Sequence, residues 1–127
     1  MIGVILVSHS EKITEGVKEM IEEMVGDSPH VKIVSAGGTG DGRLGTNSLM
    51  ILEAIQNLKE ASDVLIFGDI GSAILCADTA MDLIEDDELR EKTLLVDAPL
   101  VEGAFAAAVQ ASVNCSREDI LKEMANV

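Results

Sequence analysis

The sequence predicts a single-domain α/β fold with a parallel sheet, strand order 2-1-3-4, and helices on both faces. Three observations support this prediction. The chain has 127 residues, a length typical of one domain that spans residues 1–127. Short apolar runs alternate with segments of helical periodicity, as they do where crossover helices connect parallel strands. Apolar residues make up 47% of the chain and aromatic residues only 2%, so the core must be aliphatic, as in sheets buried on both faces.

The first half of the chain predicts two strands, each followed by a helix. Residues 2–7 form a short apolar run, as expected of a buried strand. Ser10 is a good cap for the next helix, whose apolar side chains fall on one face and which should end at Gly26. A second strand is expected at residues 31–36, followed by a glycine-rich loop and a helix over about residues 46–59.

The second half repeats the alternation. A third strand is expected at residues 64–67, and the helix after it, over residues 73–84, should be well buried because its first turns are apolar almost all round. A fourth strand is expected at residues 94–96, followed by an alanine-rich helix over residues 103–113. Ser116 begins a capping-box pattern that predicts a last short helix.

The composition excludes several classes of function. Acidic residues outnumber basic ones, 23 to 9, and the net charge of −14 argues against binding to nucleic acid. No run approaches the ~20 apolar residues of a membrane span, so no membrane association is expected. Cys76 and Cys115 form no C-x-x-C motif and suit a reducing compartment, which predicts a cytoplasmic location. No cluster of His, Cys and carboxylates has metal-ligand spacing, so we expect neither a metal nor a bound cofactor.

Two titratable residues directly follow strands of the predicted sheet. His9 comes immediately after the first strand, and Asp69 holds the equivalent place after the third. In the predicted order these strands are neighbours, so the two side chains should meet at the carboxyl edge, where such sheets bind ligands. A carboxylate on one imidazole nitrogen fixes the tautomer and leaves the other nitrogen nucleophilic, as a phosphohistidine site requires. The alternative is an unrelated loop histidine and a capping aspartate.

Two loops at this edge have features of an anion site. Gly71 and Ser72 precede the helix expected after the third strand, and helix N-termini present free backbone amides. Gly37, Gly38 and Thr39 follow the second strand, where glycines allow the backbone to approach a phosphoryl group closely. The glycines match neither the G-x-x-x-x-G-K-[ST] loop nor the G-x-G-x-x-G fingerprint, which excludes nucleotide sites of those two types.

Three further polar residues have simpler expected roles. His30 lies beside a proline in a turn and is expected to be an ordinary surface residue. Asp97 follows the fourth strand, and we expect it to cap a helix rather than to help a partner dock. Arg43 is the single arginine of the glycine-rich loop and is a candidate for contact with a phosphate or a partner, although simple solvation is the safer expectation.

Several short motifs together resemble a known family. They are Val7-Ser8-His9-Ser10, Gly45-Thr46, Gly68-Asp69-Ile70-Gly71-Ser72-Ala73 and Ala98-Pro99-Leu100-Val101-Glu102-Gly103, and the resemblance extends over essentially the whole chain. The motifs are similar to those of DhaM, the phosphotransferase subunits of phosphoenolpyruvate (PEP)-dependent dihydroxyacetone kinases. The resemblance implies the fold of the mannose-type IIA domains of the sugar phosphotransferase system (PTS).

The resemblance also implies a reaction cycle. The histidine phosphocarrier HPr would phosphorylate His9, and the phosphoryl group, carried covalently on that histidine, would pass to ADP on the subunit DhaL, which acts with DhaK on dihydroxyacetone. Asp69 matches the position that orients the histidine. The residues that match loops around the phosphoryl group are Gly37, Gly38, Thr39 and Ser72. Because the chain ends at Val127, HPr is expected to be a separate protein.

The oligomeric state and the acceptor leave alternatives open. The helix over residues 103–113 carries no charge and needs cover on both sides, which together with the resemblance favours a homodimer; a monomer covered by the last helix is the alternative. A mannose-type IIA component that donates to a IIB domain is the runner-up function. A non-catalytic α/β binding or signalling module is the alternative from another class, although a receiver module would carry an acidic pair where this chain has Ser8 and His9.

Overall fold

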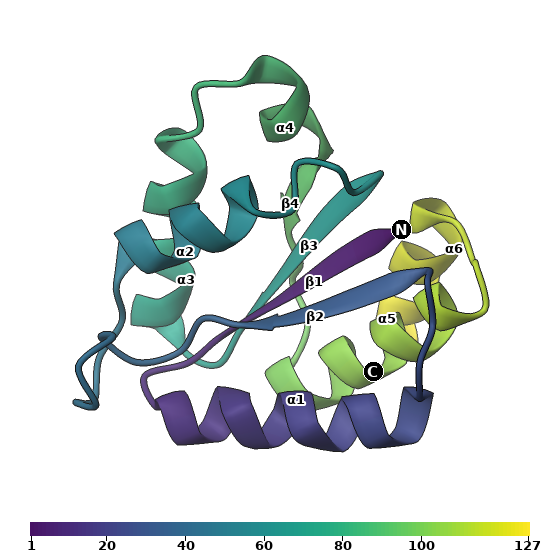
Figure 1. The fold of residues 1–127 in the computed structure, drawn as a ribbon, viewed down its shortest axis with the longest axis horizontal. Coiled ribbons are helices and arrows are strands. Elements are labelled where there is room, and N and C mark those ends of the chain that lie inside the picture. Colours follow the sequence, from purple (N-terminus) through teal and green to yellow (C-terminus); the bar gives the residue numbers. More distant parts are fainter.

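Four parallel strands form one sheet in the order β2-β1-β3-β4, as predicted, in the computed structural model, which describes residues 1–127 (Figure 1). The central strand β1 pairs with β2 on one side and with β3 on the other, and β4 pairs with the outer side of β3. All four strands therefore end at the same edge of the sheet. Their bounds are β1 (Ile2–Val7), β2 (Val31–Ser35), β3 (Asp63–Gly68) and β4 (Thr93–Leu95).

Helices cover both faces of the sheet and make a three-layered molecule (Figure 1). On one face lie α1 (Glu11–Val25), α5 (Leu100–Ser112) and α6 (Arg117–Glu123), with a 3₁₀ turn η1 (Met124–Asn126) after α6. On the other face lie α2 (Ser48–Gln56), α3 (Gly71–Asp82) and α4 (Asp87–Lys92). None of these helices is long and apolar enough to cross a membrane.

The two central strands divide the core into two apolar clusters, because successive side chains of a strand point to opposite faces. Val4 and Leu6 of β1 pack on the face of α1 and α5, whereas Ile5 and Val7 pack on the face of α2 and α3. These four side chains are fully buried. Each contributes about 1.5–3 kcal/mol of apolar burial, and this anchors the end of β1, from which His9 emerges.

Local sequence signals begin and end the helices as expected. Ser10 Oγ accepts a hydrogen bond from the Ile13 amide at the start of α1, and Gly26 ends that helix at φ +72°. Asn47 Oδ1 accepts hydrogen bonds from two amides in the first turn of α2. Ser116 Oγ accepts from the Asp119 amide and caps α6. These caps confirm the predicted starting points of three helices.

Other helix predictions were wrong in part. The helix α4 was not predicted, although Asp86 caps it with hydrogen bonds from the amides of Glu88 and Leu89. The alanine-rich helix begins at Leu100 instead of residue 103, because Pro99, at φ −58°, already has a backbone that leads into a helix. The helix α2 ends at Gln56, three residues before the expected end.

The helix α3 is less buried than its composition predicted. Only the small residues Ala73, Ala77 and Ala80 are buried, and they face the sheet. Leu75 is 68% exposed, and Ile70, the residue before the helix, is 60% exposed. An apolar composition alone therefore overestimated the burial of this helix, which leaves a large part of its surface free beside His9.

Candidate active site

The pairing of β1 with β3 brings His9 and Asp69 together. Val7, the last residue of β1, is in register with Gly68, the last residue of β3. The next residues along each strand, Ser8 and Asp69, therefore leave the sheet side by side, and His9 follows at once. The predicted meeting of His9 and Asp69 is confirmed by a distance of 3.3 Å between His9 Nδ1 and Asp69 Oδ1.

The Asp69 carboxylate contacts four donors. Its Oδ2 atom accepts hydrogen bonds from Ser8 Oγ at 2.8 Å and from the His9 amide at 3.3 Å. Its Oδ1 atom accepts from the Ile70 amide at 2.7 Å and lies beside the imidazole of His9. The carboxylate is thereby fixed in position and pointed at one nitrogen of the ring.

These hydrogen bonds also set the charge of Asp69. Partial burial by itself raises the pKa of the carboxyl group, because a charged form is less well solvated there. The hydrogen bonds from Ser8, Ile70 and His9 together outweigh that effect and hold the pKa of Asp69 below its usual value. Asp69 is therefore ionised at neutral pH and can stabilise a positive charge on the imidazole.

The two nitrogens of His9 have different surroundings. A carboxylate can only accept, so Nδ1 carries the proton in the neutral ring and donates it toward Asp69. The other nitrogen, Nε2, then keeps its lone pair and contacts Ser72 Oγ, whose hydroxyl donates to it. The His9 side chain is 28% exposed, so an incoming group can reach it. One nitrogen of the ring is thus held by a carboxylate and the other is free to act as a nucleophile.

The start of α3 presents unpaired backbone amides beside this nucleophile. The first intrahelical hydrogen bonds of α3 run from the amides of Ala73 and Ile74 to the carbonyl of Ile70. The amides of Gly71 and Ser72 have no acceptor, and Ile70 at the cap position offers no side-chain oxygen. Since Ser72 also contacts His9 through its hydroxyl, these amides lie where a group attached to Nε2 would be. The structure thus brings the predicted residue Ser72 into contact with His9, and Gly71 precedes it in the first turn of α3.

The glycine loop supports the nucleophile from the other side. The amide of Gly38 donates to the carbonyl of Ser8 at 2.9 Å, and the amide of Gly45 donates to the carbonyl of His9 at 2.8 Å. Gly37 packs so closely on α1 that a Cβ atom would lie 2.4 Å from Thr14 Oγ1. Direct contact of Gly37, Gly38 or Thr39 with a phosphoryl group stays a prediction.

The polar side chains of this loop bind one another. The Thr39 hydroxyl contacts Asp41 and the carbonyl of Arg43, and the Arg43 guanidinium pairs with Asp41 at 2.7 Å. The Arg43 side chain, followed by Thr39, lowers the pKa of Asp41 to about 2. Arg43 is 80% exposed, and its charge is directed to Asp41. The expectation of a solvated residue describes it better than that of a phosphate ligand.

Ser8 is a part of the site that the sequence analysis did not single out. It is fully buried, donates to Asp69 and accepts from the Ser10 amide at 3.0 Å. The signal was its place next to His9 at the end of a buried strand, where a polar residue needs a partner.

The expected capping role of Asp97 is wrong, because Pro99 is the cap residue of α5 and no side chain bonds the first turn. His30 lies at the opposite edge of the sheet, where its carbonyl accepts from the Ile2 amide.

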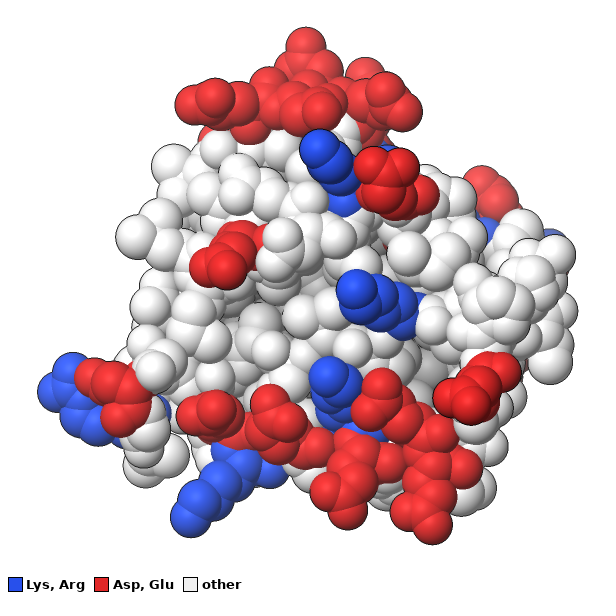
Figure 2. Space-filling view, in the orientation of Figure 1, with Lys and Arg blue, Asp and Glu red and all other residues white.

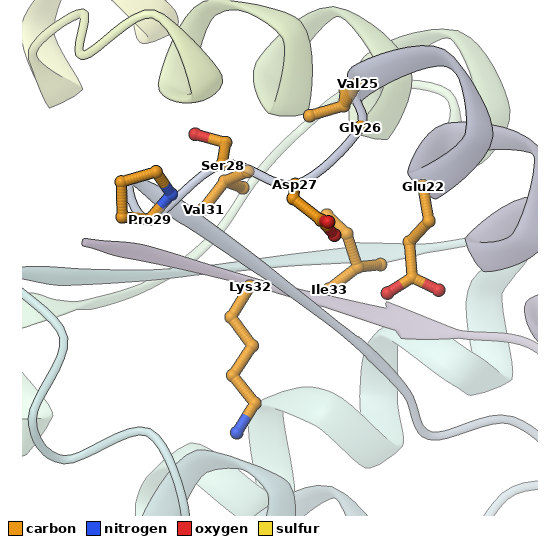
Figure 3. A pocket seen from close by; sticks show the side chains of 9 residues that line it. All are labelled: Glu22, Val25, Gly26, Asp27, Ser28, Pro29, Val31, Lys32 and Ile33. Carbon is orange, nitrogen blue, oxygen red and sulfur yellow. The ribbon is translucent and has the colours of Figure 1, made fainter.

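The largest cavity of the molecule, about 430 Å³, lies away from His9. It follows the free edge of β2 near the end of α1 (Figure 3). Glu22 and Asp27 line it on the side of α1, while Lys32 extends to the other side of the strand (Figure 3). No histidine lines this cavity, so it offers no side chain that could carry a phosphoryl group as phosphohistidine, and the site at His9 is the better candidate.

The acidic side chains are unevenly distributed over the surface. Acidic side chains gather over α4 and along α1 (Figure 2). No three or more His, Cys, Asp or Glu side chains gather in a way that could hold a metal ion.

The chain is similar to a known family and to several named relatives. Residues 3–121 match the family described as PTS system fructose IIA component. A Listeria innocua protein named "PEP-dependent dihydroxyacetone kinase 2, phosphoryl donor subunit DhaM" is 62% identical over 127 residues, which cover 100% of this chain and 99% of the relative. The Escherichia coli phosphoryl donor subunit DhaM is 37% identical over 95% of this chain, but this chain spans only 26% of its length.

Solved structures show the same fold. One is the crystal structure of a protein of unknown function, which is 44% identical in sequence and superposes with a TM-score of 0.89. The match covers 98% of this chain and 93% of that one. The PTS component EIIA from Streptococcus agalactiae is 16% identical with a TM-score of 0.65, and the match covers 99% of this chain and 91% of that one. The second likeness concerns the fold alone.

Proposed function

We infer that this chain, which belongs to the PTS fructose IIA component family and within it to the DhaM phosphoryl donor subunits, carries a phosphoryl group on His9 between two protein partners. One observation supports His9 above all others. Asp69 holds Nδ1, while Nε2 faces Ser72 and the unpaired amides of α3. The chain thus acts as the phosphoryl donor subunit of a PEP-dependent dihydroxyacetone kinase.

The proposed first step loads the histidine. The lone pair of His9 Nε2 attacks the phosphorus atom of the phosphohistidine of HPr, a new N–P bond forms, and the N–P bond to the donor breaks. The donor imidazole leaves with the electron pair of that bond. Asp69 stabilises the positive charge that develops on the His9 ring. The Ser72 hydroxyl turns from Nε2 toward a phosphoryl oxygen, and the amides of Gly71 and Ser72 donate to the others.

In the proposed second step the phosphoryl group leaves His9. A β-phosphate oxygen of ADP held by DhaL attacks the phosphorus, an O–P bond forms, and His9 leaves as the neutral imidazole. DhaL with DhaK then phosphorylates dihydroxyacetone. The phosphoryl group is carried covalently, and this chain needs no bound cofactor for its own step. The cycle requires that both partners reach His9 in turn, in the compartment that holds HPr, which we take to be the cytoplasm.

The test of this proposal is labelling with radioactive PEP, enzyme I and HPr. The chain has two histidines, so His9→Ala should abolish labelling and His30→Ala, the matched control, should leave it unchanged. Label on His30, or none on the unaltered protein, would contradict the proposal. A non-catalytic module would not be labelled at all. Transfer from the labelled protein to DhaL–ADP, compared with transfer to a IIB domain, distinguishes the two possible acceptors.

We also propose a homodimer through α5. Val101, Val109 and Val113 are 44%, 40% and 71% exposed and follow one another at helical spacing with the half-buried Phe105 between them. Glu102 is the only charged residue of this helix. Two chains of charge −14 repel except where both surfaces are uncharged. Val109 and Val113 lie toward the edge opposite His9, and an interface centred on them leaves both sites open.

Light scattering tests the association. The unaltered chain should scatter as a dimer at micromolar concentration, and Val109→Glu should scatter as a monomer of 13.4 kDa that still accepts a phosphoryl group. A monomer for the unaltered chain would contradict the dimer without affecting the role of His9.

A further inference from the structure

A second cavity lies next to the active site, at the carboxyl edge beyond β3 and β4. Its volume is about 380 Å³, and it lies between the segment Gly68–Gly71, the residue Ile74 of α3 and residues 95–98. In the order β1-β3-β4 it lies on the other side of Asp69 from His9. The cavity shares Asp69 with the site of His9, so a protein that binds over His9 can also reach this cavity.

Two carboxylates lie at this cavity, and only one of them is free. Asp69 is surrounded by its four donors. Asp97 is exposed, and it takes part in none of the three ion pairs of the molecule and in no side-chain hydrogen bond. The negative charge of Asp97 is therefore available to an incoming group.

The backbone holds Asp97 in a fixed place. The Ala98 amide donates to the Val96 carbonyl at 3.1 Å, which closes a three-residue turn with Asp97 at its centre. Val96 is 5% exposed and its amide bonds Ile66 of β3 at 2.9 Å. Asp97 caps no helix, so its fixed position serves no purpose in the fold that the structure shows.

The shape and chemistry of the cavity fit one kind of side chain. Ile74, Leu95 and Val96 supply apolar walls, and Asp97 supplies a negative charge at the rim. Arginine and lysine combine an apolar stem with a cationic end, so they match both features. A divalent metal ion would need several oxygen ligands, and a single free carboxylate does not provide them.

We propose that this cavity receives an arginine or lysine side chain of the protein that donates the phosphoryl group, with its cationic end on Asp97. The proposal rests on the proposed function, because it takes His9 as the point of approach. Asp97 acts here in docking and orients the donor over His9. The chemical step itself is left to His9, Asp69 and the start of α3.

The experiment compares Asp97→Asn with Asp87→Asn in phosphorylation by phospho-HPr. Asp87 lies exposed on α4, which precedes β4 and so lies toward the opposite edge, and its substitution removes the same charge without touching the cavity. Asp97→Asn should raise KM about threefold to tenfold at low salt, leave kcat unchanged and weaken the dependence of the rate on salt. Asp87→Asn should change none of these. Both variants should react with phosphoramidate, a donor without side chains, as fast as the unaltered protein.

The outcomes separate the two proposals. Equal rates for both variants with phospho-HPr would overturn the docking role of Asp97 and leave His9 as the carrier. A slower reaction of Asp97→Asn with phosphoramidate would overturn it too, because the substitution would then act on the site itself. If phosphoramidate labels the unaltered protein on His9 and phospho-HPr does not, the carrier function fails as well.

Discussion

Two helices begin beside His9, and only one of them has a side-chain cap at its N-terminus. The helix α1 follows β1 and is capped by its own Ser10, whose hydroxyl accepts from the Ile13 amide. The helix α3 follows β3, and the residue in its cap position, Ile70, has no polar atom in its side chain. Both starts lie at the same edge of the sheet and leave their first two amides without an acceptor, but only α1 has a side-chain cap, on its third amide. The difference indicates that stability was given up at α3, where a negatively charged group is expected to bind.

The largest effect is expected at Asp69, which lies between the two helix starts. Asp69→Asn should slow transfer to and from His9 by about 10²- to 10⁴-fold, because the amide cannot stabilise the charged ring and can favour the wrong tautomer. Rapid-quench labelling with phospho-HPr measures the rate, and thermal unfolding checks the fold. An unchanged rate would reduce Asp69 to a structural residue.

The next effect is expected at Ser72, the side chain that α3 directs at Nε2. Ser72→Ala should slow transfer about tenfold to a hundredfold, since one donor to the phosphoryl oxygens is lost while the amides remain. The matched control is Ser10→Ala at the start of α1, which should leave the chemical step nearly unchanged. Equal losses of rate in the two variants would contradict the distinction between the two helices.

A substitution at Ile70 can give α3 the side-chain cap that it lacks. Its backbone, at φ −138° and ψ 174°, has the extended conformation of a normal cap residue. Ile70→Ser should therefore cap α3, raise the free energy of unfolding by up to ~1 kcal/mol and slow transfer several-fold by occupying an amide. Ser10→Ala should lower the free energy of unfolding of the protein by ~1 kcal/mol. Urea unfolding together with the transfer assay measures both; a cap at Ile70 that leaves the rate unchanged would show that the free amides have no role.

The smallest effect on the rate is expected at Ser8, which acts through Asp69. Ser8→Ala removes the strongest hydrogen bond that lowers the pKa of Asp69, so this pKa should rise toward its ordinary value. The depressed pKa stabilises the fold above the unfolded pKa of about 3.9, and this contribution is lost as the pH falls through the folded pKa. In the variant this contribution should be smaller, and its loss should be complete at a higher pH. Titration of the Asp69 carboxyl by carbon NMR, with Ser62→Ala as a control at the other edge, measures the shift.

Sequence reasoning reached the parts of the site that depend on strand order. His9 and Asp69 could be placed together because each directly follows a strand and the topology makes those strands neighbours. The amides of Gly71 and Ser72 were expected from the start of the third helix. Ser8 was missed although it lies between a buried strand and His9, because its complete burial and its hydrogen bond to Asp69 become visible only in the fold.

The errors have the same physical origin. Asp97 is of a residue type that often caps helices, but the backbone turn at Val96–Ala98 and the cap position of Pro99 leave its carboxylate without a helix to cap. The helix α3 has the apolar composition of a buried segment. Only its alanines pack on the sheet, however, and Leu75 is exposed to solvent. Composition predicts what a residue is able to do, whereas its orientation decides what it does.

The burial of all of β1 and of all but the first residue of β3 has a consequence for hydrogen exchange. Amides in these central strands open only when the whole domain unfolds, whereas short peripheral elements such as α4 open through small local fluctuations. His9 and Asp69 are each attached directly to one of the two slowest-exchanging segments. Partial unfolding at the edges of the molecule would therefore leave the pair intact, and the ability to accept a phosphoryl group should disappear only with the last protected amides.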